Sequence, residues 1–291
     1  MRRNFPVLQK VHYITAAVAV AGIGLLYWLG DTTPPPPKPG SQQMAQMQGD
    51  GAHASHATAS TDSILQASRA QLPQHAAAEI DNIEKEIRAM GDSSRMAPAF
   101  TKLAKAWQQH KQLPAAAYYH ALAAKLDNSE KNLNFAGQFF LDLVHQASSE
   151  SVKMWEAEQA VACFQRSLEL NPNNDTTKMA LAAAYIEGVG ETMQGVQLLL
   201  GITREKPDNI PANLMLGRLA IQSGQHDKAI MRYETVLKQE PKNTEALYFL
   251  AEAYKGKGNK EKAIELLEDC KKIVNKPEFS KDIDNYIQSF K

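Results

Sequence analysis

A period of 34 residues in the C-terminal part of the chain constrains the fold more than any other feature of the sequence. Within residues 210–275, two segments repeat the same order of small, apolar and turn-forming residues, so that Gly217 corresponds to Ala251 and Gly224 to Gly258. Small residues let two helices approach closely, and a glycine adopts the positive φ of a tight turn without steric cost. The pattern therefore predicts two consecutive helical hairpins.

A single hairpin of this kind cannot bury its apolar face, so neighbouring hairpins must stack. The two copies resemble the tetratricopeptide repeat (TPR) family, on Leu214, Leu216, Gly217, Gly224, Asp227, Ala229, Tyr233, Val236 and Pro241, and then on Leu247, Leu250, Ala251, Tyr254, Gly258, Ala263, Leu267 and Cys270. The resemblance implies an all-α, TPR-type solenoid of helical hairpins. It also implies that the first helix of each hairpin lines a concave groove for a peptide or a partner's helix.

We expect about five repeats over residues 95–277. The second exceeds the 34-residue period by ten residues, and we place the excess near residues 142–158. We interpret it as a lengthened first helix, a polar loop and an early start to the second helix. The third repeat has one extra residue, which we place in the turn around residues 188–190.

Capping helices are expected on both sides of the repeats, because the end of a solenoid must cover its last apolar face. Residues 61–94 contain Ile80, Ile83, Ile87 and Met90 at helical spacing, which predicts an N-terminal helical cap. Residues 278–291 are expected to form a C-terminal capping helix.

The N-terminus is expected to anchor the chain in a membrane. Residues 11–30 carry no formal charge, and a helix of this length would run about 30 Å. Arg2, Arg3 and Lys10 precede the span, so the positive-inside bias places residues 1–10 in the cytoplasm. We therefore expect a single-pass protein of a bacterial inner membrane with a periplasmic repeat domain. A cleaved signal peptide is the alternative, but bulky Tyr27 and Trp28 stand where small residues should mark cleavage.

Residues 31–60 read as a disordered linker that joins the anchor to the folded domain. A proline-rich segment comes first and favours an extended spacer, and a Gln-, Met- and His-containing tract follows it. Met44, Met47, His53 and His56 are of types that bind copper, but four such residues in a tract without fixed structure do not predict a site. We expect no metal site and no cofactor.

No catalytic constellation is visible, and we predict that the protein is not an enzyme. The sequence lacks a phosphate-binding glycine loop and any nucleophile or ligand spacing. His120, Cys163 and Cys270 fall on apolar stripes, which predicts buried core residues. The 32 basic and 32 acidic residues balance, which gives no indication of a nucleic-acid partner. A small-molecule substrate is not expected either.

Placed on this chain, the TPR resemblance implies a peptide-binding groove lined by Leu133, Phe140, Met179, Ile186, Leu214, Arg218, Ile221, Tyr248 and Glu252. Most are apolar, so we expect a protein or peptide partner with an apolar or helical segment. Some TPR proteins grip a C-terminal carboxylate with Lys and Asn. At the matching positions stand Thr101, Lys105, Ala180, Pro211 and Met215, so that clamp is absent. The alternative is a groove filled by a terminal helix or by the 142–158 insertion.

These features together predict a non-enzymatic, membrane-anchored TPR adaptor. Its architecture is similar to the TPR subunits of cytochrome c biogenesis and to anchored periplasmic TPR partners of the translocon. The resemblance implies a role in cytochrome c maturation or in the handling of exported proteins. The alternative is a structural scaffold that self-associates, since Ala17, Ala21, Gly22 and Gly24 allow close approach of two membrane helices.

Overall fold

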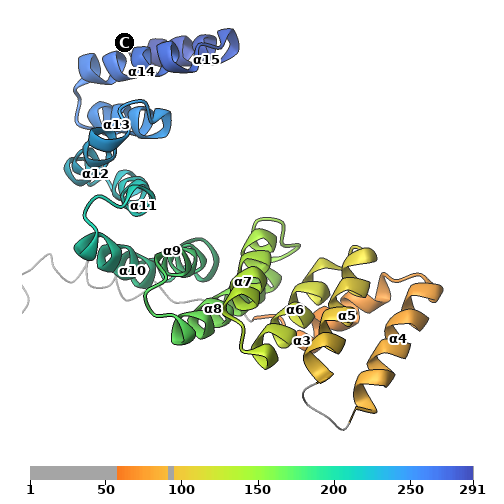
Figure 1. Cartoon of the computed structure of the whole chain (residues 1–291). Coiled ribbons are helices and arrows are strands. Elements are labelled where there is room, and N and C mark those ends of the chain that lie inside the picture. The colour runs from red at the N-terminus through yellow and green to blue at the C-terminus, as the bar shows by residue number, and fades with distance from the viewer. Residues whose placement is uncertain (1–57, 91–94, 291) are drawn as a thin grey trace, which may run out of the picture. The chain divides into compact units, whose positions relative to one another are not determined.

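The computed structural model describes residues 58–90 and 95–290, and within these ranges every regular element is helical (Figure 1). The helices are α3 (Thr61–Ala70), α4 (Gln74–Arg88), α5 (Met96–Gln109), α6 (Leu113–Asp127), α7 (Glu130–Val144), α8 (Glu150–Leu170), α9 (Asp175–Ala183), α10 (Thr192–Glu205), α11 (Ile210–Gln222), α12 (His226–Gln239), α13 (Thr244–Gly256), α14 (Lys260–Val274) and α15 (Pro277–Gln288). A π-helical segment, Ala184–Val189, continues α9.

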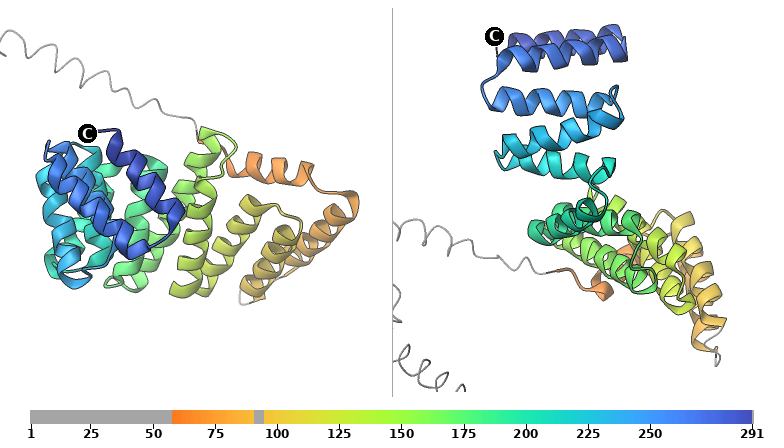
Figure 2. Two further views of the ribbon diagram at one scale, coloured as in Figure 1. Left: turned by 90° about the horizontal axis from the view of Figure 1, so that it is seen from above. Right: turned by 60° about the vertical axis from the view of Figure 1, so that its left-hand side comes forward.

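Five hairpins follow one another along the chain: α5–α6, α7–α8, α9–α10, α11–α12 and α13–α14. The two helices of each hairpin pack together, and the second helix packs on the first helix of the next hairpin. Figure 2 shows α11 to α15 in successive layers. The predicted all-α solenoid of helical hairpins is confirmed for the described residues. We call the first helix of each hairpin its A helix and the second its B helix.

The hairpins at α11–α14 form as their sequence directs. Asn209 and Asn243 cap the A helices, with side-chain oxygens that accept hydrogen bonds from the N–H groups of Ala212 at 3.0 Å and Ala246 at 2.9 Å. Where the A helices end, Gly224 and Gly258 take the left-handed conformation, with φ of 70° and 81°. The residue after each glycine donates its N–H to a carbonyl five positions earlier.

A close contact joins the two helices of the α11–α12 hairpin. A Cβ atom on Gly217 would lie 2.6 Å from the ring of Tyr233 on α12, so only glycine permits this approach. Tyr233 is fully buried in the core that the last two hairpins share with α15. The contact fixes which side of α11 faces inward and leaves the opposite side of the A helix to face solvent.

The insertion in the second hairpin lies within the expected range of residues 142–158. The A helix α7 has 15 residues, whereas the A helices α11 and α13 have 13 each, so the first helix is longer by two residues. The extra residues form the loop at 145–149 and the start of α8, which runs for 21 residues. The predicted early start of the second helix is confirmed. Ser149 caps it by accepting the N–H of Val152 at 3.3 Å.

The extra residue of the third hairpin also lies in a helix and not in the turn. It is absorbed in the π-helical segment Ala184–Val189, where the helix widens to accept one more residue per turn. Within that segment, a Cβ atom on Gly188 would lie 2.5 Å from the Cβ of Ala157 on α8. The lack of a side chain at Gly188 therefore lets the widened turn pack closely on the preceding hairpin.

The N-terminal helices α3 and α4 diverge from each other (Figure 2). The apolar stripe of α4, including Ile80, Ile83 and Ile87, is buried against α5. Helix α3 leaves α4 and packs on α6 and on the early turns of α8. There the N–H of Ala59 donates to the carbonyl of Ser151 at 3.1 Å.

Two side-chain hydrogen bonds add to this contact between α3 and α8. The indole N–H of Trp155 donates to Thr61 Oγ1 at 3.0 Å, and Thr58 Oγ1 donates to Glu158 at 3.1 Å. Ile64 packs into the cluster that contains Trp155. The insertion therefore holds the N-terminal helix, a role that the sequence did not indicate.

None of the helices in the described ranges combines the length and the apolar character that a membrane crossing requires. The expected membrane span at residues 11–30, and the expected linker except for its last three residues, lie outside the described residues.

Candidate functional site

The predicted groove residues are carried by the A helices α7, α9, α11 and α13 and by the π-helical segment. Two of the nine residues do not face solvent. Leu133 and Phe140 are both 0% exposed, and Phe140 packs edge-on against Trp155 with ring centroids 5.4 Å apart. Their placement in the groove is corrected here, because both are core residues of the second hairpin.

The physical reason is a shift of one residue in the repeat register. Gly137, not Ala136, makes the close approach in α7, because its Cβ would lie 2.7 Å from the ring of Phe164. This matches the contact of Gly217 with Tyr233. The insertion lies between Gly137 and Phe164, so spacing alone could not identify the pair.

With this register, Phe135 takes the solvent-facing position of α7, and it is 53% exposed. Its ring lies edge-on to His120 of α6, with centroids 5.3 Å apart. Sequence reasoning missed Phe135, and the signal that could have found it is Gly137, the glycine nearest to it in the helix. An exposed aromatic ring on this face is a candidate contact for a partner.

Two predicted residues at the C-terminal end of the groove are covered by the protein itself. Tyr286 of α15 stacks on Tyr248 of α13 with ring centroids 6.1 Å apart, and its hydroxyl donates to Glu252. Lys255 donates to the same hydroxyl. Burial and the bond to Glu252 raise the pKa of Tyr286, so it stays protonated. The capping helix α15 therefore occupies the groove face of α13.

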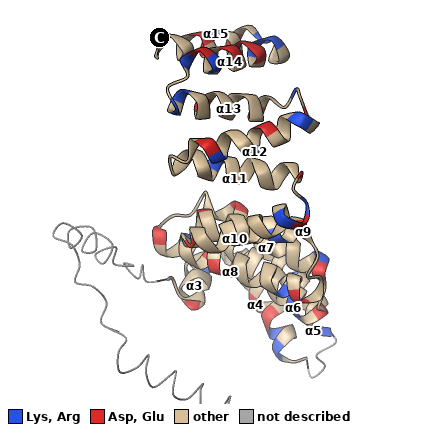
Figure 3. Ribbon diagram, turned by 90° about the vertical axis from the view of Figure 1, so that its left-hand side faces the viewer, with Lys and Arg blue, Asp and Glu red and all other residues tan. Residues whose placement is uncertain are grey.

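The face between the third and fourth hairpins is hollowed. Ile186 and Arg218, both predicted groove residues, border one depression of about 130 Å³ together with Glu187, Met215, Leu219 and Gln222. Met179, Leu214 and Ile221 are half-buried nearby, while Arg218 is exposed. Arg218 is the single charged residue of α11, and Figure 3 shows how little charge this helix carries. A partly apolar surface that also carries a guanidinium, the carboxylate of Glu187 and the amide of Gln222 suits an amphipathic segment.

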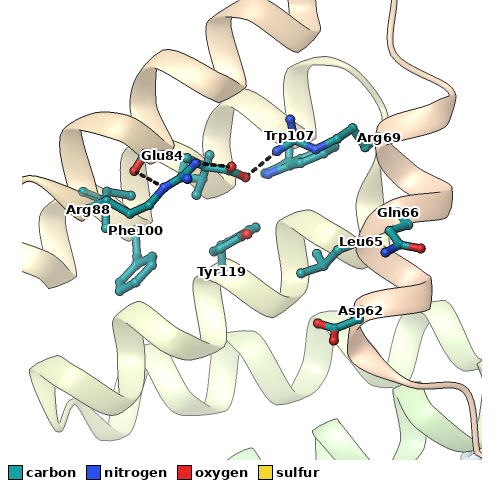
Figure 4. Close-up of a pocket in the computed structure, with 11 residues that line it drawn as sticks. Asp62, Leu65, Gln66, Arg69, Glu84, Arg88, Phe100, Trp107 and Tyr119 are labelled. Atoms are coloured by element: carbon teal, nitrogen blue, oxygen red, sulfur yellow. Dashed lines mark hydrogen bonds and ion pairs between the residues drawn. The ribbon is translucent and has the colours of Figure 1, made fainter.

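A second hollow lies at the other end of the described chain, between the divergent helices α3 and α4 and the first hairpin (Figure 4). Its volume is about 450 Å³, within the range of sites that hold small ligands. The wall is mainly apolar and aromatic, and the rim is charged. The lining residues are Asp62, Leu65, Gln66, Arg69, Glu84, Ile87, Arg88, Phe100, Leu103, Trp107 and Tyr119.

An ion-pair network bridges this second hollow. Arg69 of α3 pairs with Asp81 and Glu84 of α4, the latter at 2.7 Å, and its guanidinium lies 5.9 Å from the centre of the Trp107 ring. Arg88 reaches the other oxygen of Glu84 at 3.3 Å. The Trp107 indole N–H is buried without an acceptor.

The buried titratable groups do not assemble into a reactive site. Burial raises the pKa of the Cys163 and Cys270 thiols to about 11, so both stay protonated and unreactive near neutral pH. Burial lowers the pKa of His120, which keeps its imidazole neutral. Residues 58–90 and 95–290 bring together no group of three His, Cys, Asp or Glu side chains that could hold a metal. Met44, Met47, His53 and His56, for which no metal site was expected, lie outside these ranges.

Comparison with known proteins identifies the C-terminal hairpins. Residues 220–280 match the family described as tetratricopeptide repeat. This segment is therefore similar to tetratricopeptide repeats. The family resemblance inferred from the 34-residue period is confirmed there, and TPR segments mediate protein–protein interaction.

Relatives of known sequence or structure extend this result to the fold. A curated relative is the mouse (Mus musculus) interferon-induced protein with tetratricopeptide repeats 3, which is 29% identical over 118 residues. That match covers 40% of this chain and 29% of the mouse protein, so the chain spans less than a third of the relative's length.

Among solved structures, that of the MamA protein has a TM-score of 0.50 at 18% identity, over 64% of this chain and 94% of MamA. That likeness shows a shared fold. YrrB, described as a TPR protein with an unusual peptide-binding site, has a TM-score of 0.47 at 18% identity, over 70% of this chain and 97% of YrrB.

Proposed function

We propose that this protein is a non-enzymatic adaptor that binds an apolar or helical segment of a protein partner on the A-helix face between the third and fourth hairpins. The hollow that brings Ile186, Met215 and Arg218 together carries the proposal. This part of the face is not covered by α15, whereas the face of α13 is. The binding roles of Met179, Leu214 and Ile221 are part of the same proposal.

We further propose that residues 11–30 anchor the adaptor in a bacterial inner membrane and place the repeats in the periplasm. The support is the uncharged span, the basic residues before it and the linker after it. Cytochrome c maturation and the handling of exported proteins are the two pathways that this architecture suggests. A scaffold that self-associates without a client is the alternative, and the small residues Ala17, Ala21, Gly22 and Gly24 of the span favour it.

The proposal is tested by crosslinking in cells from a photo-reactive residue at Met215. The matched control carries the same residue at Met193, which is 67% exposed on the B helix α10. We expect partner adducts from position 215 and few from position 193, with mass spectrometry identifying the partners.

The identity of the crosslinked partners distinguishes a role in cytochrome c maturation, a role in export, and a self-associating scaffold. An apocytochrome or a haem-ligation component indicates cytochrome c maturation, and many different exported chains indicate a general role in export. Adducts with the protein itself favour the scaffold. Equal yields from both positions would contradict a binding surface at the hollow.

A further inference from the structure

The 450 Å³ pocket at the N-terminal end is separate from the A-helix groove. On α5 it uses Phe100, Leu103 and Trp107, whereas Thr101, Lys102 and Lys105 border another hollow on a different side of that helix. The pocket exists because α3 packs on α6 and α8 and not along α4, which leaves the space between α3 and α4 open. It therefore offers a site that the groove proposal does not use.

The interior of the pocket favours an apolar ligand. Leu65, Ile87, Phe100, Leu103 and Tyr119 line it together with Trp107 (Figure 4). The rings of Phe100 and Tyr119 stack at 6.0 Å and those of Trp107 and Tyr119 at 6.5 Å, so the aromatic wall is continuous. Flat aromatic surface of this kind binds apolar side chains strongly.

The rim carries opposite charges at opposite ends. Figure 4 shows Asp62 of α3 at one end of the pocket and Arg88 of α4 at the other. Within the described residues, no basic side chain lies within 4.0 Å of Asp62. Arg88 is 74% exposed, and its side chain touches Glu84 through two contacts of 3.3 Å. Both groups are therefore available to a ligand.

Of the two arginines at the rim, Arg69 is held by two carboxylates, whereas Arg88 is held by one. Arg69 is engaged by Asp81 and Glu84 together, and Glu84 keeps Arg69 at 2.7 Å even if Arg88 turns to another acceptor. One carboxylate shared by two guanidinium groups leaves Arg88 with spare capacity to bind an anion.

We propose that this pocket binds short apolar peptides with free ends, with the amino group at Asp62 and the carboxylate at Arg88. The apolar side chains of the peptide lie against the aromatic wall. The pocket volume suits a ligand of a few residues.

Isothermal titration calorimetry of the full-length protein with the dipeptide Leu-Phe tests the proposal. Three blocked forms of the peptide are titrated for comparison: one with an acetylated amino end, one with an amidated carboxyl end, and one with both ends blocked. Each blocked end removes one charge contact, so we expect each to weaken binding to the wild-type protein by about fivefold. The pocket variants are Asp62→Asn and Arg88→Gln. Arg204→Gln, at an exposed position of α10, is the matched control.

The effect of blocking one end of the peptide should disappear when the side chain that binds that end has been replaced. We expect acetylation to have no further effect on Asp62→Asn, and amidation to have none on Arg88→Gln. Arg204→Gln should bind as the wild type does. Thermal unfolding of each variant checks that the fold is intact, and both substitutions lie at exposed positions.

Three results would overturn the proposal. They are the absence of Leu-Phe binding to the wild-type protein at millimolar peptide, equal binding of free and doubly blocked peptides, and equal weakening by Arg204→Gln. Equal binding of the blocked peptide would indicate that the pocket takes internal apolar segments of a polypeptide. Because the groove residues are not involved, failure of this test leaves the crosslinking test at Met215 unaffected.

Discussion

The hairpins α11–α14 and the region α3–α8 build similar packing from sequences of different regularity. In α11–α14 the period is 34 residues and glycines stand at both turns. In α3–α8 an insertion lengthens α8, a lysine stands at a left-handed turn position, and the first helix packs away from its neighbour. Both regions nevertheless press a helical glycine against an aromatic ring, Gly217 against Tyr233 and Gly137 against Phe164.

The comparison teaches that the packing of a helical glycine against an aromatic ring is kept even where the 34-residue period of the sequence is lost. The turn after α5 makes the same point, because Gln112 donates its N–H to the carbonyl of Trp107 at 3.0 Å. Gln225 and Asn259 make the equivalent bonds after α11 and α13. Lys111 therefore occupies the place of the turn glycines.

The largest expected effect separates core from groove in the irregular region. Phe140→Ala should destabilise the fold by about 3–5 kcal/mol, because it leaves a cavity beside Trp155. Leu214→Ala, at a half-buried groove position in the regular region, should cost about 1–2 kcal/mol. Urea unfolding of both variants measures the difference. A small effect at Phe140 would return this residue to the groove.

A smaller effect comes from Glu156 in the lengthened helix α8. Its side chain is 2% exposed with one carboxylate oxygen unpaired, and burial raises its pKa from 4.5 to about 7. The folded state thus holds a proton that the unfolded state releases, so stability is full below pH 4.5 and is lost as the pH rises to about 7. Glu156→Gln should remove this loss and stabilise the protein by about 2–3 kcal/mol at pH 8.

Urea unfolding at pH 4.5 and pH 8 checks this prediction, with Glu205→Gln at an exposed site as the control. We expect little change at pH 4.5 for either variant. A gain from Glu156→Gln that is equal at the two pH values would argue against titration of this carboxyl.

The smallest effect compares the turns of the two regions. Lys111 has φ of 58°, and Gly258 has φ of 81° at the matching turn. Lys111→Gly should stabilise the protein by about 1 kcal/mol, because it relieves left-handed backbone strain, and Gly258→Ala should destabilise it by a similar amount. Thermal unfolding of the two variants tests this. Effects of the same sign would show that the turns are not equivalent.

The sequence predicted the hairpins in which small residues recur at a fixed spacing along the chain. The period around Gly217 and Ala251 located both regular hairpins, because each small residue must meet a partner at fixed spacing. The site of the third hairpin's extra residue was not predictable, since a π-helical turn and a longer loop use the same number of residues. The destination of α3 was not predictable either, because it depends on Trp155 and Ser151, about 90 residues away.

The candidate site divides in the same way. Ile186 and Arg218 were placed on the groove face by repeat register, and the structure brings them to one hollow. Leu133 and Phe140 were misplaced, because the small residues Ala136 and Gly137 are adjacent and a shift of one residue turns a helix face by about 100°. Tyr286 covers Tyr248, and the pocket at Arg88 forms between α3, α4 and the first hairpin. Both features arise from packing between helices, which no local sequence pattern encodes.

The contact of residues 58–64 with α8 has a mechanical consequence. A chain that enters a stack of hairpins at its first helix is peeled from the end, one hairpin at a time, when its N-terminus is pulled. Here a pull on Thr58 is carried directly to Ser151 and Glu158, in the second hairpin. Through these contacts the load reaches the second hairpin without passing along α4 and α5, which lie between these residues in the sequence. A tether at the N-terminus would therefore strain the middle of the array as well as α3, whose residues Asp62 and Leu65 line the Arg88 pocket.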